Sequence, residues 1–165
     1  MIFAKLENEV CTIIAFPRDK KSVAKAVCEM RTLIEKEKPP KNQWDLKTMS
    51  GGIVDLEFIA QFALITHVME FHIGATTADI LSQLPNSFLN QPFISDLHHA
   101  YGLYTNLSQI IRLCLNDLLD PHEMPPSLSD LLLSNVGEPD LLRAEKLIEE
   151  TRQSVCSAFT HVMKY

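Results

Sequence analysis

The sequence predicts an all-α protein, a helical bundle of about five to seven helices around a buried central helix. Three observations predict this fold class. Apolar residues recur every three or four positions along several segments, and Pro or Gly ends most of these segments. Only the short stretch 12–16 is a candidate strand. Glycine is also scarce, with five in 165 residues, and Leu, Ala, Glu and Lys are plentiful.

Length and composition indicate one domain, residues 1–165, with a real hydrophobic core. Hydrophobic residues make up 46% of the chain and charged residues 22%, as in ordinary globular proteins. The formal net charge of −6 and the short basic runs 18–21 and 36–41 argue against nucleic-acid partners and anionic membranes. There is no signal peptide and no apolar run of membrane-spanning length, so a cytoplasmic location is expected.

The four cysteines indicate neither a zinc site nor a disulfide framework. No two are close in sequence, and each occupies an apolar position of an expected helix. We therefore expect reduced, buried thiols. They are Cys11, Cys28, Cys114 and Cys156.

Two helices are expected before the first proline pair. One covers 2–16 and is interrupted by Pro17, and the second covers 19–38, where Pro39 and Pro40 end it. The apolar residues of the second recur at helical spacing: Val23, Ala26, Val27, Met30, Leu33 and Ile34.

The third helix is the predicted centre of the bundle. Gly52 is its expected N-cap and Asp55 its acidic first-turn residue. The helix runs to about residue 71, and Gly74 ends it. Its apolar residues lie all the way round, which is typical of a helix buried by its neighbours.

Two helices of unequal length come next. A short one covers 77–84, with Thr76 or Thr77 as its cap, and a long one covers 93 to about 119 after the loop 85–92. The long helix has one apolar face: Leu97, Ala100, Tyr101, Tyr104, Leu107, Ile111, Cys114 and Leu118.

The end of the chain holds two more apolar segments. Ser127 is expected to cap a short one that reaches Val136, and Gly137 breaks it. Pro139 then occupies the favoured first position of the last helix. The residues that repeat along this helix form a seam for another helix: Leu141, Ala144, Ile148, Thr151, Val155, Ala158 and Val162.

The stretch DLKTMSGGIVDLEFIAQF, residues 45–62, carries the strongest functional signal. Helix N-termini bind anions, Gly51 and Gly52 would let a phosphate approach the backbone, and Lys47 would add a positive charge. The competing interpretation is structural: a glycine turn, a first-turn acid at Asp55 and a satisfied buried glutamate at Glu57.

The two carboxylates of this stretch cannot bind one metal together. Asp55 and Glu57 are two residues apart, so they point about 200° away from each other on a helix. Glu57 and Gln61 are four apart and share a face. One acid is therefore expected to face a polar site or a partner domain, while the other pins the loop.

Independent catalysis has little support in the sequence. The pair His98–His99 is partly similar to metal-dependent phosphohydrolases, but these need a His-Asp pair, and Ala100 follows here. No nucleophile elbow, phosphate-binding P-loop or G-x-G-x-x-G is present. A free-standing phosphohydrolase is thus the weakest hypothesis, and we expect neither a metal site nor a cofactor in this chain.

A long motif resembles one family. The pattern Lys-x-x-x-Gly-Gly-hydrophobic-x-Asp-hydrophobic-Glu-Phe-Ile-x-Gln looks like the signature of the helical domain in glutamine synthetase adenylyltransferases. Here the pattern starts at Lys47 and ends at Gln61. VCEMRTLIEKEK upstream and AYGLYTNLSQIIRLCL downstream are also similar to that family. The resemblance covers most of the chain, and it extends more distantly to uridylyltransferases that act on the PII signalling protein.

The resemblance implies a domain of a larger enzyme. Members of the family carry two nucleotidyltransferase domains, each followed by a helical bundle, and VDLEF is similar to the C-terminal, adenylylating copy. A nucleotidyltransferase domain would then precede Met1. The parent would use ATP and Mg²⁺ to transfer AMP to a tyrosine of glutamine synthetase, which regulates nitrogen assimilation. Residues near the nucleotide or at the domain interface would be Lys47, Gly51, Gly52, Asp55, Glu57 and Gln61.

An interaction module is the alternative hypothesis. In that case the bundle binds glutamine synthetase or PII through its acidic surface and has no role at the nucleotide site. The position of the motif residues discriminates between the two: a common exposed end favours a catalytic interface, and burial favours a scaffold.

Overall fold

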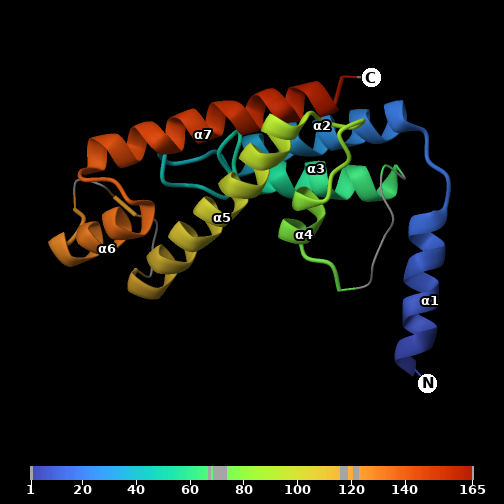
Figure 1. Cartoon of the computed structure of the whole chain (residues 1–165), viewed down its shortest axis with the longest axis horizontal. Helices are drawn as coiled ribbons and strands as arrows, with labels where there is room; N and C mark the ends of the chain where they lie inside the picture. The colour runs from blue at the N-terminus through green and yellow to red at the C-terminus, as the bar shows by residue number, and fades with distance from the viewer. Residues whose placement is uncertain (1, 67, 69–73, 116–118, 121–122, 165) are drawn as a thin grey trace.

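The computed structural model describes residues 2–66, 68, 74–115, 119–120 and 123–164. Within these residues the chain forms seven helices and no strand, which confirms the all-α prediction (Figure 1). The helices are α1 (Ile2–Ala15), α2 (Lys20–Glu37), α3 (Ile53–Ile65), α4 (Thr77–Ser82), α5 (Gln91–Cys114), α6 (Pro126–Val136) and α7 (Leu141–Val162).

Helix α3 lies at the centre of the bundle, as predicted. It contacts α1, α2, α4, α5 and α7, whereas α1 and α6 lie at opposite ends of the molecule (Figure 1). Leu56, Ile59, Phe62 and Ala63 of α3 are fully buried. The helix is not covered all the way round, however, because Val54, Phe58 and Ile65 remain half-buried and Gln61 is exposed.

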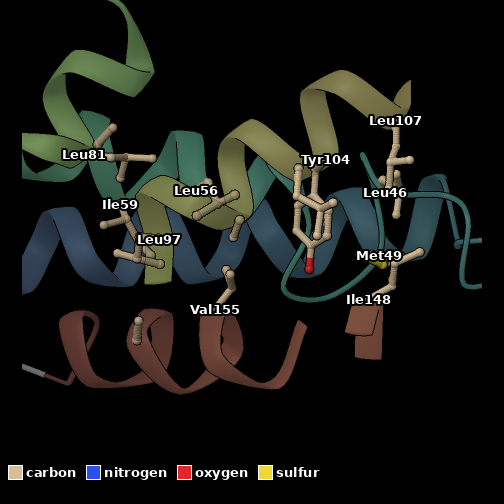
Figure 2. Packing of buried hydrophobic residues seen from close by; sticks show 14 of the residues in the cluster. Leu46, Met49, Leu56, Ile59, Leu81, Leu97, Tyr104, Leu107, Ile148 and Val155 are labelled. Atoms are coloured by element: carbon tan, nitrogen blue, oxygen red, sulfur yellow. The ribbon is translucent and has the colours of Figure 1, made fainter. Parts of the chain in front are cut away.

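The long helices α5 and α7 provide the core that α3 packs against. The predicted seam of α7 is confirmed, since Ala144, Ile148, Val155, Ala158 and Val162 are buried. Figure 2 shows Ile148 and Val155 facing the side chains of Leu97, Tyr104 and Met49. Burial of each large apolar side chain contributes about 1.5–3 kcal/mol.

Side-chain caps decide where several helices begin. Asp140 caps α7, and its carboxylate accepts a hydrogen bond from the Arg143 amide at 2.9 Å. Pro139 therefore lies before the cap, and its predicted place at the first helical position was wrong. Ser127 likewise lies inside α6, which begins at Pro126 with Pro125 as its N-cap. Gly137 ends α6 in the left-handed conformation, as predicted.

Three predicted helices end earlier in the structure. Helix α3 ends at Ile65, where the Thr66 hydroxyl donates to the Phe62 carbonyl at 2.7 Å. Helix α4 ends at Ser82 rather than residue 84, and α5 spans Gln91–Cys114 because Asn90, not a later residue, caps it. The rest of the predicted lengths of α3 and α5 falls largely on 67, 69–71 and 116–118, outside the described residues.

The prediction of buried thiols was wrong. Cys11, Cys28 and Cys114 are exposed and Cys156 is half-buried, and all four are free. Helices α1 and α2 lie on the outside of the bundle, so an apolar neighbourhood in their sequence does not mean burial. No described helix is both long and apolar enough to cross a membrane.

Candidate functional site

The glycine turn that precedes α3, residues 46–52, is closed by its own backbone. The amides of Gly52, Ile53 and Val54 donate to the carbonyl oxygens of Met49, Leu46 and Lys47 at 2.9, 2.9 and 3.2 Å. The Gly51 amide donates to the Asp55 carboxylate at 2.5 Å. These four donors are the ones that an anion at the helix start would need. They are used within the turn in this structure.

Both glycines are buried where the turn approaches other backbone atoms. Gly51 has a φ of +78°, and a Cβ atom there would clash with the Arg152 carbonyl oxygen of α7 and lie 2.8 Å from the Cys156 sulfur. A Cβ atom on Gly52 would lie 2.6 Å from the Leu46 carbonyl oxygen. The glycine pair thus allows the turn to pack against α7 and to close on itself.

Asp55 forms a buried ion pair with an arginine from α2. The Arg31 Nε atom lies 2.5 Å from Asp55 Oδ1, and the two side chains are only 8% and 3% exposed. Arg31 also donates through Nη2 to the Thr48 carbonyl oxygen at 3.2 Å. One arginine therefore ties α2 both to the glycine turn and to the start of α3.

The electrostatics of Asp55 follow from this burial. Burial raises the pKa of its carboxyl above the ordinary value, while the Gly51 amide and the Arg31 guanidinium act in the opposite direction. A buried carboxylate that lost its cation would be strongly destabilising. Asp55 therefore acts as a structural residue of the turn.

The six residues predicted from the motif divide into two groups. Gly51, Gly52 and Asp55 are buried in the turn. Lys47 and Gln61 are exposed, and Glu57 is half-buried one turn before Gln61 on α3. Only the second group can contact a molecule outside this bundle.

Two hollows lie along the border between α2 and α3, which we call the α2–α3 seam. One has a volume of about 320 Å³, and Lys47, Val54 and Leu33 are among its lining residues. The other has a volume of about 570 Å³, and Gln61 and Phe58 line it on the α3 side. Lys47 and Gln61 thus line different hollows of the same seam, and the motif extends along both.

Sequence reasoning missed Arg31 as part of this arrangement. Arg31 stands seven residues after Ala24, the other buried residue of α2, so the two share a helix face. A single arginine on the buried face of a helix, together with an acid at the start of an apolar helix, is the signal that could have predicted the pair.

Other proteins resemble this chain over nearly its whole length. A protein of Bartonella quintana, named bifunctional glutamine synthetase adenylyltransferase/adenylyl-removing enzyme, is 78% identical over 160 residues, which are 97% of this chain and 16% of that protein. Proteins of the same name from Bartonella henselae and Brucella suis biovar 1 are 79% and 41% identical, over 98% and 94% of this chain and 16% of each protein.

These relatives are much longer than the chain, which spans about a sixth of the length of each one. No family model matches the chain, and no solved structure matches it either. The resemblance predicted from the motif at 47–61 is confirmed: the chain corresponds to one segment of the bifunctional glutamine synthetase adenylyltransferase/adenylyl-removing enzymes.

Proposed function

We propose that this bundle is the C-terminal helical domain of a cytoplasmic glutamine synthetase adenylyltransferase and that it supports the nucleotidyltransferase domain before it. The observation that carries the proposal is the match of 97% of the chain to only 16% of a relative with that name. The parent enzyme would transfer AMP from ATP to a tyrosine of glutamine synthetase. Its Mg²⁺ would neutralise the phosphates during an in-line displacement, in the upstream domain.

Within this proposal the motif has a scaffolding part and a contact part. Gly51, Gly52 and Asp55 shape the turn from inside the bundle. Lys47, Glu57 and Gln61 reach the surface along α3 and the turn before it. We assign these three side chains to the contact with the catalytic domain, where a lysine suits phosphates and a glutamate suits basic loop residues.

Replacement of Glu57 by glutamine in a full-length enzyme tests this assignment. We expect AMP transfer to glutamine synthetase to fall about tenfold, because a hydrogen bond to a charged group contributes about 1.5–3 kcal/mol. The melting temperature should stay within about 2 °C of the parent, since Glu57 is only half-buried and the change is nearly isosteric.

Glu150→Gln is the matched control for that experiment. Glu150 lies on α7, where its side chain is 61% exposed and faces Lys146 in a surface pair. This variant should keep full AMP transfer. Transfer by Glu57→Gln that equals the control would overturn the assignment. If Glu57→Gln leaves the rate of AMP transfer unchanged but weakens binding to glutamine synthetase or PII, the result would instead favour the interaction module.

A further inference from the structure

One face of α2, on the side that borders α3, is apolar and uncovered in this chain. Of its residues only Ala24 and Arg31 are buried. Met30 is 49% exposed and Leu33 is 51% exposed, although both belong to the apolar pattern that predicts the helix. A helix with an apolar stripe on its solvent side is typical of a surface that another part of a protein covers.

Helix α3 contributes a second apolar row beside this face. Val54, Phe58 and Ile65 stand four and seven residues apart, so they follow one line along the helix, and each is half-buried. Both hollows of the α2–α3 seam lie between this row and α2. The apolar surface therefore extends along both helices and is not confined to one residue.

Leu113 and Leu142 are exposed apolar residues with a different arrangement. Leu113 is 86% exposed at the end of α5, and Leu142 is 78% exposed at the start of α7, with neither lining a hollow of the seam. Single exposed leucines are normal on protein surfaces. They serve as internal controls for the seam.

We infer that the α2–α3 seam is the docking surface for the nucleotidyltransferase domain of the same enzyme, through an apolar segment of that domain. This inference rests on the proposed function, and it specifies the surface through which the bundle would support the nucleotidyltransferase domain. The relatives of this chain are about six times longer than it, so most of each enzyme lies outside the matched segment.

The charges around the seam fit such a contact. Arg18 and Asp19 lie at one end, and Glu37, Lys38 and Lys47 lie at the other, while the lining between them is mostly apolar. An apolar centre with a charged rim is the usual anatomy of a protein interface. It also places Lys47 and Gln61 where a docked domain would meet them.

Cysteine labelling tests the docking surface without an activity readout. Met30→Cys and Leu33→Cys are made in the 165-residue chain and in a full-length Bartonella quintana enzyme that carries these residues as its matched segment. Cys28 and Cys114 are replaced by serine throughout, because both are exposed and lie close to introduced cysteines. Leu142→Cys and Leu113→Cys are the controls. A maleimide reagent is used, and labelled peptides are counted by mass spectrometry.

We expect the two seam cysteines to label at least about tenfold more slowly in the full-length enzyme than in the chain alone, with the controls unchanged. Equal labelling in both proteins would overturn the inference. So would protection that is already present in the 165-residue chain: a second copy would then cover the seam if dilution removes the protection, and α1 would cover it if dilution does not. The activity of Glu57→Gln does not affect this readout, so the two proposals can fail separately.

Discussion

Replacement of Arg31 by methionine is expected to lower the free energy of unfolding by about 3–5 kcal/mol. Methionine fills a similar volume, but it leaves the Asp55 carboxylate without its cation inside the bundle. The Gly51 amide would remain as a hydrogen-bond donor to Asp55. Urea denaturation at neutral pH measures the effect. Arg112→Met, at an exposed position of α5, should change the stability by no more than about 0.5 kcal/mol.

The loss of stability in Arg31→Met should increase as the pH rises. Burial already raises the pKa of Asp55, and removal of the guanidinium takes away one of the influences that lower it. A carboxyl whose pKa is higher in the folded than in the unfolded protein favours folding below its unfolded pKa of about 4, and this contribution is lost as pH rises through the folded pKa. The deficit should therefore be smallest near pH 4 and grow toward neutral pH.

A second variant separates the buried charge from the lost packing. In Arg31→Met/Asp55→Asn no charge remains at the pair, and the asparagine oxygen can still accept from the Gly51 amide. We expect this double variant to be more stable than Arg31→Met at pH 7 and to lack its pH dependence. If Arg31→Met costs no more than Arg112→Met, the ion pair does not hold α2 to the turn.

The fold was predictable from local patterns, and the errors in the predicted helix boundaries have local causes. The seam of α7 follows directly from residues three and four apart, and Gly137 ends α6 because it takes a φ of +77°. At the start of α7, Pro139 and Asp140 are both helix-start signals at neighbouring positions. The hydrogen bond of the Asp140 carboxylate to Arg143 decides between them.

The site was less predictable because it depends on contacts between distant segments. Spacing alone indicates that Asp55 and Glu57 face opposite ways, but not that Arg31 comes within 2.5 Å of Asp55. The apolar pattern of α2 likewise says nothing of whether this chain or another domain covers Met30. The motif correctly predicted the position of the turn. Which of its residues are buried and which are exposed depends on the tertiary structure.

Gly51→Ala should destabilise the bundle by about 2–5 kcal/mol, the sum of two separate effects. A residue with a side chain at φ +78° costs about 1–2 kcal/mol in the left-handed conformation. Its Cβ atom also meets the Arg152 carbonyl oxygen, which is backbone and cannot rotate away, and such overpacking costs about 1–3 kcal/mol. Thermal unfolding should show a decrease of about 2–4 °C for each kcal/mol.

Comparison with Gly137→Ala isolates the steric effect, because the two glycines share a conformation and differ in surroundings. Gly137 has a φ of +77°, and a Cβ atom there would meet no atom within 4 Å. This control should lose only the conformational part, about 1–2 kcal/mol. A Gly51→Ala variant as stable as the control would contradict the close approach of the turn to α7. In a full-length enzyme the difference should extend to AMP transfer, since Gly51, unlike Gly137, lies in the turn that holds Lys47 and starts α3.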